Sequence, residues 1–365
     1  MSPTYVPLGA LRAFAAATFA ACGLEVAHAG IAAESLCYAD LVGMDTHGIA
    51  NLARLYVPRL RDGRIDPSAE PGLLSQRGGT ALLDGRNGLG LYVGTLALDE
   101  ALSRARRHGV GAVAVRRSSH LGSAGYYVSR AAKHGMIALA MSNCGTQRIA
   151  RPPGGLETML GTNPLSAAAP GGELPAVVLD MSTTVVPTGQ VRAARARGER
   201  IPEGWLVDDD GRPVTDPAAY DEGRGHLLWL GGAPTTGAYK GFGLGLLVDV
   251  LAGVLSGAGT GPTGAPGADD ANVGHFMLAL DVSTFRPLDD FREEMDAILG
   301  TLLSCPAAPG AQVRYPGHRE SESALRRAAG GVPLAPSVAR ELAELARELG
   351  IDPPCPSVAG HSEGG

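Results

Sequence analysis

The chain has 365 residues, 45% of them hydrophobic and 19% charged, a composition that favours a globular protein and excludes a disordered chain, a collagen or a coiled coil. Asp and Glu number 37 against 31 Lys and Arg, for a net charge of -6, so the molecule as a whole has no electrostatic affinity for nucleic acid or a membrane surface. The five cysteines include no CxxC pair, which argues against a disulfide framework or a zinc knuckle.

Helical patterns come first along the chain. Apolar residues recur at helical spacing over residues 8–22 and 25–42, and Gly23 separates the two segments. The Ala-rich first segment lacks the basic start of a signal peptide, and no run reaches the ~18 apolar residues of a membrane span. We therefore expect a cytoplasmic protein that acts on a small molecule.

From about residue 80, short runs typical of strands alternate with longer helical patterns. This alternation favours an α/β core. The predicted strands are 80–83, 110–115, 136–141 and 176–180, and the predicted helices between them are 94–108 and 123–134.

The last third continues the pattern with a helix over 242–255, a flexible Gly- and Pro-rich segment over 256–272 and a buried strand over 275–281. A terminal helix is capped by Ser337 and stopped by Gly350. We divide the chain into three parts. They are a helical part, 1–75, packing with the C-terminal helix of 320–350; an α/β core for cofactor and substrate, 76–319; and a flexible tail, 351–365.

One glycine pattern is misleading. Gly259, Gly261 and Gly264 satisfy GxGxxG, but that dinucleotide fingerprint needs a strand before it and a helix after it. Here a predicted helix precedes the pattern. The ordinary Rossmann signature is therefore absent, and any nucleotide must be held by another arrangement.

Two histidine motifs carry possible chemistry. Asp45-Thr46-His47-Gly48 follows the second helix and can donate protons or bind a carboxylate, or it can simply end that helix. Ser118-Ser119-His120-Leu121-Gly122-Ser123 joins a strand to a helix, where α/β sheets collect ligands. The positive end of the following helix favours a neutral His120 ring, which suits proton transfer to an alkoxide; a loop-bridging role is the alternative.

Polar residues recur at the other predicted strand ends. Ser142-Asn143-Cys144, Gly161-Thr162-Asn163-Pro164 and Asp180-Met181-Ser182 can hydrogen-bond ribose, carboxamide or phosphate groups, although such residues also form ordinary turns. Asp180 can orient a histidine, bind ribose or cap a turn. Lys240, one of only two lysines, lies between Gly237 and Gly241 and suits a cofactor phosphate or a substrate carboxylate; the alternative is a solvated loop lysine.

In this order the motifs resemble the malate/L-lactate dehydrogenase family, whose cofactor fold is not an ordinary Rossmann fold. Relatives include ureidoglycolate, sulfolactate and diketogulonate oxidoreductases and a cyclic-imine reductase. The matching stretches are Tyr38-Ala39-Asp40, Asp45-Thr46-His47-Gly48, Ser118-Ser119-His120-Leu121-Gly122, Gly161-Thr162-Asn163-Pro164-Leu165, Leu179-Asp180-Met181-Ser182, Ile201-Pro202-Glu203-Gly204-Trp205, Tyr239-Lys240-Gly241-Phe242-Gly243 and Pro316-Gly317.

The resemblance implies a homodimer that uses NAD or NADP to interconvert a small 2-oxo acid and an L-2-hydroxy acid. It implies that His120 is the proton donor and acceptor and that His47 is the second active-site histidine; we group Asp180 with them. We expect the two imidazoles to meet beside the nicotinamide ring. The residues assigned to cofactor binding are Ser119, Gly122, Cys144, Thr162, Asn163, Asp180, Met181, Ser182 and Lys240.

The predicted substrate-binding residues are Thr46, Asn51 and Arg54, and here the chain departs from the family. Thr46 stands where serine is usual, and Asn51 stands where many members have an arginine for the substrate carboxylate; Arg54 is the substitute arginine. Cys144 replaces a frequent serine and His318 a frequent glutamate. These departures concern the identity of the substrate more than the class of reaction.

Three other functions stay open. The nearest is reduction of a cyclic 2-imino acid, because protonating an imine nitrogen needs nearly the same geometry. A metal-dependent hydrolase could chelate its ion with Asp45, His47, His120 and Asp180, although no metal-binding spacing supports a site. The third is a nucleotide-binding protein without catalytic activity, which the change at Asn51 would fit.

Overall fold

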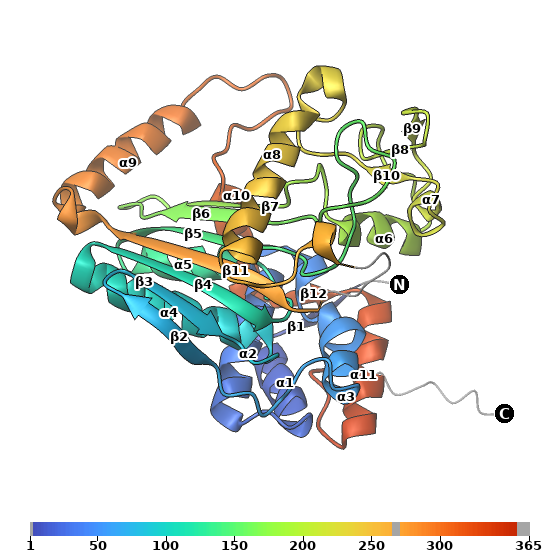
Figure 1. Ribbon diagram of the computed structural model, residues 1–365, viewed down its shortest axis with the longest axis horizontal. Coiled ribbons are helices and arrows are strands. Elements are labelled where there is room, and N and C mark those ends of the chain that lie inside the picture. The colour runs from blue at the N-terminus through green and yellow to red at the C-terminus, as the bar shows by residue number, and fades with distance from the viewer. Residues whose placement is uncertain (1–2, 265–270, 356–365) are drawn as a thin grey trace. The chain divides into compact units, whose positions relative to one another are not determined.

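A computed structural model describes residues 3–264 and 271–355, and the chain divides into two compact units (Figure 1). Unit 1 comprises Met1–Ser68 with Glu320–Gly365, and unit 2 comprises Ala69–Arg319. Part of the predicted flexible segment, 265–270, and most of the predicted tail, 356–365, lie outside the described residues.

Unit 1 is helical, and its first two helices pack against each other. The predicted pair is confirmed as α1 (Leu8–Ala21) and α2 (Val26–Val42), with Gly43 ending α2 in a left-handed conformation at φ 89°. Its core includes Leu11, Phe19, Leu36 and Tyr56. The other elements of this unit are β1 (Thr4–Val6) paired with β12 (Val332–Leu334), the 3₁₀ turn η1 (Asp45–His47), the π-helical turn η2 (Leu52–Tyr56), α3 (Val57–Arg61), α10 (His318–Gly330) and α11 (Pro336–Leu349).

The predicted terminal helix is α11, and Gly350 ends it with φ 67° as expected. The predicted cap is wrong, because the N-cap residue is Ala335 and Ser337 lies inside the first turn. Pro336 opens the helix instead, and its fixed φ suits the first helical position.

Unit 2 is built on one mixed sheet, whose seven strands in the described residues follow the order β2-β3-β4-β11-β5-β6-β7. They are β2 (Gly72–Arg77), β3 (Thr80–Asp84), β4 (Val110–Ser118), β11 (Val273–Asp281), β5 (Met136–Ser142), β6 (Leu165–Ala169) and β7 (Val177–Met181). Only the β3–β4 pair is parallel. Because β11 runs against both β4 and β5, and β6 against both β5 and β7, the strands β3, β4, β5 and β7 share one direction.

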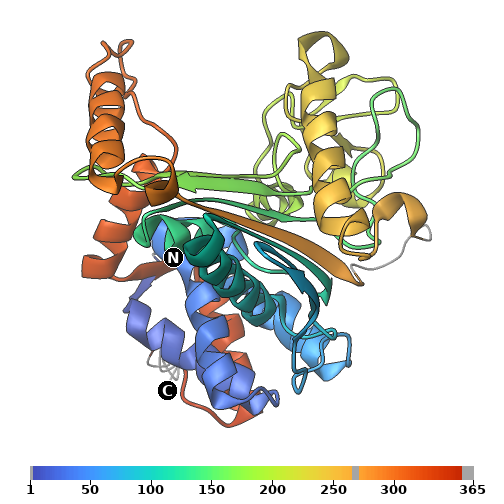
Figure 2. The same cartoon turned by 60° about the vertical axis from the view of Figure 1, so that its left-hand side comes forward.

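Helices cover both faces of this sheet (Figure 2). The helices α4 (Gly90–His108) and α5 (Gly125–Lys133) pack on one face. On the other face α8 (Ala238–Val248) continues into the π-helical η4 (Asp249–Val254), and Val248 and Ala252 pack against Met141 of β5. The predicted α/β core is therefore confirmed, with an α8 that begins four residues before the predicted start.

Several elements were not predicted from the sequence. A small sheet is formed by β8 (Leu206–Val207), β9 (Pro213–Val214) and β10 (His226–Leu227), beside α6 (Thr188–Ala196) and α7 (Ala218–Asp221). The acidic helix α9 (Leu288–Leu303) buries only Leu299. The remaining 3₁₀ turns are η3 (Pro234–Thr236), η5 (Gly261–Thr263) and η6 (Val282–Thr284). Among the helices of the described residues, none has the length and apolar character needed to cross a membrane.

Candidate active site

The strand directions of unit 2 gather the predicted loops at one edge of the sheet. The strands β3, β4, β5 and β7 run the same way, so their last residues, Asp84, Ser118, Ser142 and Met181, lie at the same edge. The His120 loop, the Cys144 loop and the turn of residues 180–182 leave the sheet there. Loops at the carboxyl ends of strands are where α/β proteins usually bind ligands.

A buried histidine joins the last residues of two of these strands. His275 lies in β11, between β4 and β5, and is fully buried. Its Nε2 is 2.8 Å from Ser118 Oγ, and its Nδ1 is 2.9 Å from Ser142 Oγ. Burial lowers the pKa of His275 to about 3, so the ring is neutral and bridges two hydroxyls. Sequence analysis missed it, because its only signal was one polar residue within an apolar strand.

This bridge predicts loss of stability in acid. The pKa of His275 lies below the ordinary value of 6.5, so the unfolded chain binds the extra proton first as the pH falls below about 6.5. We expect His275→Gln to lower the free energy of unfolding at pH 8 and to flatten its acid slope by up to about 1.4 kcal/mol per pH unit. Urea unfolding between pH 4.5 and 8 measures both, with His108→Gln as an exposed control. An unchanged acid slope would contradict the assignment.

The ring of His120 is half-buried and has a defined tautomer. Its Nδ1 accepts a hydrogen bond from the backbone N–H of Gly122 at 3.1 Å, so a ring with one proton carries it on Nε2. The preceding Ser119 accepts a hydrogen bond from Gly90 N at 2.8 Å and donates to Gly88 O at 3.2 Å. The start of α4 therefore braces the backbone of the His120 loop.

Asp180 connects β7 to the helix that follows the His120 loop. Its carboxylate accepts hydrogen bonds from Ser123 Oγ and from Gly125 N, both at 2.8 Å. A Cβ at Gly125 would be 2.9 Å from an Asp180 oxygen, so the glycine is needed for this approach. Of the roles left open by the sequence, the contacts show a cap, although the helix capped is α5 and not the next turn of the chain.

The other polar turns make largely internal contacts. Asn163 is fully buried and donates to Gly245 O of α8 at 2.8 Å. Cys144 Sγ is 3.7 Å from Thr162 Oγ1, and burial raises the pKa of the Cys144 thiol. Ser182 donates to Thr184 O at 2.9 Å. Cys144, Thr162, Met181 and Ser182 are half-buried, so they keep surface that a ligand could reach.

Lys240 differs from these residues because its side chain is exposed. It lies in the first turn of α8, after Gly237, which has φ 115°. Its ammonium lies 5.9 Å from the ring centroid of Tyr239. In the described residues no carboxylate lies within ion-pair distance of it. A positive charge beside the N-terminus of a helix suits an anionic group.

In unit 1 the His47 loop is shaped by Asp40. This buried carboxyl accepts a hydrogen bond from Ile49 N at 2.7 Å, and a Cβ at Gly48 would lie 2.2 Å from its Oδ1. Thr46 Oγ1 is 3.0 Å from His47 Nδ1. Burial lowers the pKa of His47 and raises that of Asp40 to about 8, so a neutral imidazole lies on a loop held by a buried acid.

Two of the three side chains expected to bind substrate, Asn51 and Arg54, are held by contacts within unit 1. Asn51 Nδ2 donates to Thr46 O at 3.0 Å, and Arg54 binds Glu341 of α11 through two bonds of 2.7 Å. Arg327 of α10, which sequence analysis missed, donates to Asp40 O at 2.6 Å and pairs with Asp45.

His47 belongs to unit 1 and His120 to unit 2, so the expected meeting of the two imidazoles stays a prediction. Within the described ranges, no group of three or more His, Cys, Asp and Glu side chains is placed to hold a metal ion.

The fold and this edge define a class: an α/β protein without the ordinary dinucleotide fingerprint, whose polar strand-end loops suit small-molecule chemistry. The sequence model of the malate/L-lactate dehydrogenase family matches residues 6–343. The chain belongs to that family.

The sequences of individual relatives align with this chain over most of its length. The malate dehydrogenase of Pyrococcus abyssi is 36% identical over 350 residues, 95% of each protein. The ureidoglycolate dehydrogenase (NAD(+)) of Escherichia coli K12 is 33% identical over 317 residues, 86% of this chain and 87% of the relative.

Solved structures show the same fold. Malate dehydrogenase from Entamoeba histolytica superposes with a TM-score of 0.90 at 30% identity, covering 97% of this chain and 100% of the other. Delta1-piperideine-2-carboxylate reductase from Pseudomonas syringae superposes with a TM-score of 0.80 at 27% identity, covering 94% and 100%.

Proposed function

We propose that this protein is an NAD- or NADP-dependent oxidoreductase that interconverts a small 2-oxo acid and the corresponding L-2-hydroxy acid. The observation that carries the proposal is the shared edge of β4, β5 and β7, where the loops of His120, Cys144 and Asp180 leave the sheet. Its dehydrogenase relatives support the same reaction class. We also propose a cytoplasmic location, since the cysteines are free thiols.

The residues present fit a nicotinamide dinucleotide. Lys240 offers an exposed ammonium at the start of α8 for an anionic phosphate group. Thr162 and Ser182 supply half-buried hydroxyls for sugar or amide groups. The buried Asn163 has a structural role, because its side chain donates a hydrogen bond to α8. When bound, the cofactor would supply or accept the hydride.

His120 is the proposed proton donor. Since its Nδ1 accepts from Gly122, the ring presents its N–H at Nε2, and from there it can donate to a substrate oxygen that gains negative charge. Ser119, Gly90 and Asp180 hold the flanking backbone in place. The ring thus acts as a fixed donor rather than a mobile surface group.

The acid group of the substrate is assigned to Thr46 and His47, with Asn51 holding the loop backbone. Arg54 reaches a substrate carboxylate only by exchanging its present partner Glu341. This arrangement distinguishes the chain from family members with an arginine at position 51.

The proposal is tested by measuring the oxidation of NADH and of NADPH as a loss of their absorbance. The panel contains a 2-oxo monocarboxylate, a 2-oxo dicarboxylate and a cyclic 2-imino acid, each with and without a chelator. Turnover of a 2-oxo acid supports the proposal. Turnover of the imino acid alone supports the alternative that the solved piperideine-2-carboxylate reductase favours.

The remaining outcomes of the panel contradict the proposal. Activity that a chelator abolishes and zinc restores would indicate metal-dependent chemistry. Cofactor binding without turnover of any acid or imine would indicate a protein that binds nucleotides without catalysis.

We also propose that the protein is a homodimer, which the family resemblance implies. Five apolar side chains of α8, η4 and the residue after it are exposed, as expected of a face that binds a partner: Leu246, Leu247, Val250, Val254 and Leu255. A second copy can cover this face symmetrically.

Light scattering tests the dimer. We expect the native protein to contain two chains per particle and the Val250→Glu variant to contain one. The control variant is Val110→Glu, because Val110 is exposed at a separate site. A monomeric native protein would contradict the proposal.

A further inference from the structure

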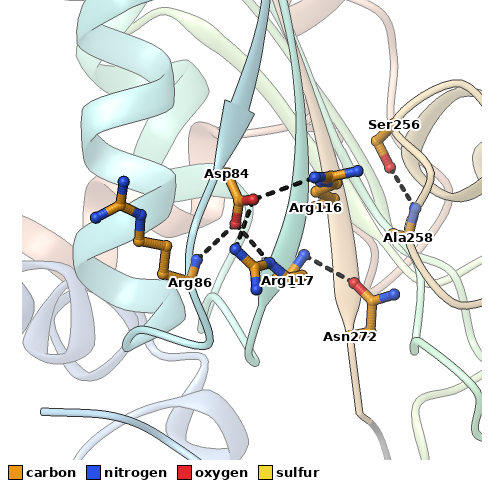
Figure 3. Close-up of polar contacts among 7 residues, drawn as sticks. All are labelled: Asp84, Arg86, Arg116, Arg117, Ser256, Ala258 and Asn272. Carbon is orange, nitrogen blue, oxygen red and sulfur yellow. Dashed lines mark hydrogen bonds and ion pairs between the residues drawn. The ribbon is translucent and has the colours of Figure 1, made fainter. Parts of the chain in front are cut away.

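A buried carboxylate lies at the end of β3, next to the strand that carries the His120 loop. Asp84 is 3% exposed. It accepts two bonds from the guanidinium of Arg117, at 2.8 and 2.7 Å, one from Arg116 at 3.3 Å and one from the backbone N–H of Arg86 at 2.9 Å (Figure 3). Burial opposes ionisation, but these donors keep the pKa of Asp84 below its usual value. The group is therefore a carboxylate clamped by two arginines.

The clamp surrounds unusual backbone. The described residues include five non-glycine residues with positive φ, and four of them, Arg86, Asn87, Arg117 and Asn272, lie in or beside this cluster, at φ 50°, 61°, 49° and 52°. Arginine is costly in this region, because its Cβ crowds the backbone. Such conformations persist only where the surroundings hold them, and they gather at functional sites.

The surroundings hold Arg117 from three sides. Its side chain binds Asp84, and its N–H donates to Asn272 Oδ1 at 2.8 Å (Figure 3). Its carbonyl accepts a hydrogen bond from Asn87 N at 2.7 Å. The register of β4 against β11 shifts at the same place, because Ser118 pairs with Val273 whereas Val115 pairs with His275. The strand therefore carries one extra residue at 116–117, a β-bulge.

This bulge lies directly before the His120 loop. The next residue, Ser118, already contacts His275, and Ser119 contacts the start of α4. A bulge turns the strand and redirects the side chains that follow it. The direction in which the chain leaves β4 thus depends on the left-handed conformation of Arg117.

We propose that Asp84 is a positioning residue for His120: through its ion pair with Arg117 it fixes the bulge that directs the His120 loop. The proposal rests on the proposed function only for the role of His120. The clamp itself is a property of the backbone and can be measured separately.

The test compares Asp84→Asn with the double variant Asp84→Asn, Arg117→Asn. Asparagine at position 84 keeps the size but loses the charge, so Arg117 loses its ion pair and keeps only its two backbone bonds. We expect kcat to fall by about 10²-fold, the cost of a small misplacement of reacting groups, while the KM for NADH or NADPH is unchanged. Asparagine at position 117 adopts left-handed φ without an anchor, so the double variant is expected to regain at least about tenfold in kcat.

Backbone hydrogen exchange of residues 117–123, followed by mass spectrometry, supplies a readout independent of turnover. We expect exchange in this segment to be at least about tenfold faster in Asp84→Asn and to slow again in the double variant. The matched control is Asp62→Asn. The Asp62 carboxylate also accepts hydrogen bonds from an arginine guanidinium and from a backbone N–H, and both donors belong to Arg64. This variant is expected to change neither kcat nor the exchange of residues 117–123.

Three outcomes overturn the inference: native kcat and exchange in Asp84→Asn, no recovery in the double variant, or losses that follow the melting temperature equally in all variants, including Asp62→Asn. Because asparagine at position 117 needs no anchor, the double variant also guards against a failure of Asp84→Asn to fold. If the native protein turns over no acid or imine, the proposed function fails, and the exchange results alone still decide whether Asp84 holds this loop.

Discussion

Replacing His120 with alanine is expected to lower kcat by at least about 100-fold, the low end of what a positioned proton donor contributes. The variant keeps the backbone braces from Gly90 to Ser119 and from Asp180 to Gly125, because neither involves the imidazole. Cofactor binding, measured by fluorescence of NADH or NADPH, is therefore expected to stay near that of the native protein. The variant is therefore expected to lose kcat and to keep its affinity for the cofactor.

The control for this prediction is His108→Ala. His108 is exposed at the end of α4, so its removal changes the histidine count without touching the sheet edge. Native turnover in a folded His120→Ala protein would show that another group supplies the proton and would remove the central assignment of the proposed site.

Gly90→Ala is expected to have the second large effect, although it adds only one methyl group. A Cβ at this position would lie 2.0 Å from Ser119 O and 2.6 Å from His120 O. Both are backbone oxygens, so they cannot move aside as a flexible side chain can. We expect a loss of about 3 kcal/mol in the free energy of unfolding, at the upper end for overpacking, and a fall in kcat because the His120 loop must shift.

Gly30→Ala is the matched control. Gly30 is exposed within α2, and a Cβ there meets nothing within 4 Å. Alanine is the better helix former, so we expect a gain of up to about 1 kcal/mol. Urea unfolding of both variants gives the comparison. Equal stabilities for the two alanine variants would contradict the close approach of α4 to the His120 loop.

Local sequence predicted the elements that have strong local patterns. The helices α1 and α2 and the strands β3, β4, β5, β7 and β11 match expected segments to within a few residues. The small sheet of β8, β9 and β10 was missed because each strand has two residues, too few to show an alternation. The helix α9 was also missed, although Leu288, Phe291, Met295, Ile298 and Leu302 recur there at helical spacing. Sequence gives no sign that this apolar face stays largely uncovered, with only Leu299 buried.

The site was predictable where residues follow a strand and not where they join distant segments. The positions of His120, Cys144 and Asp180 follow from their strands. His275 bridges residues 133 and 157 positions away, and no spacing rule indicates such a contact. Asn163 and Arg54 were assigned to ligand binding from their local sequence, which does not indicate their contacts with α8 and Glu341. Sequence near a polar residue does not reveal which remote element will use it.

The insertion of β11 between β4 and β5 also constrains how the protein is made. The first residue of β11 is Val273, while β4 and β5 end at Ser118 and Ser142. More than a hundred further residues must therefore be synthesised after β4 and after β5 before the strand that pairs with both is present. Until then each presents an open row of backbone donors and acceptors, the kind of edge on which chains aggregate. The edge of the sheet that is proposed to bind the ligand is thus completed late, by a strand that contributes none of the residues first assigned to the chemistry.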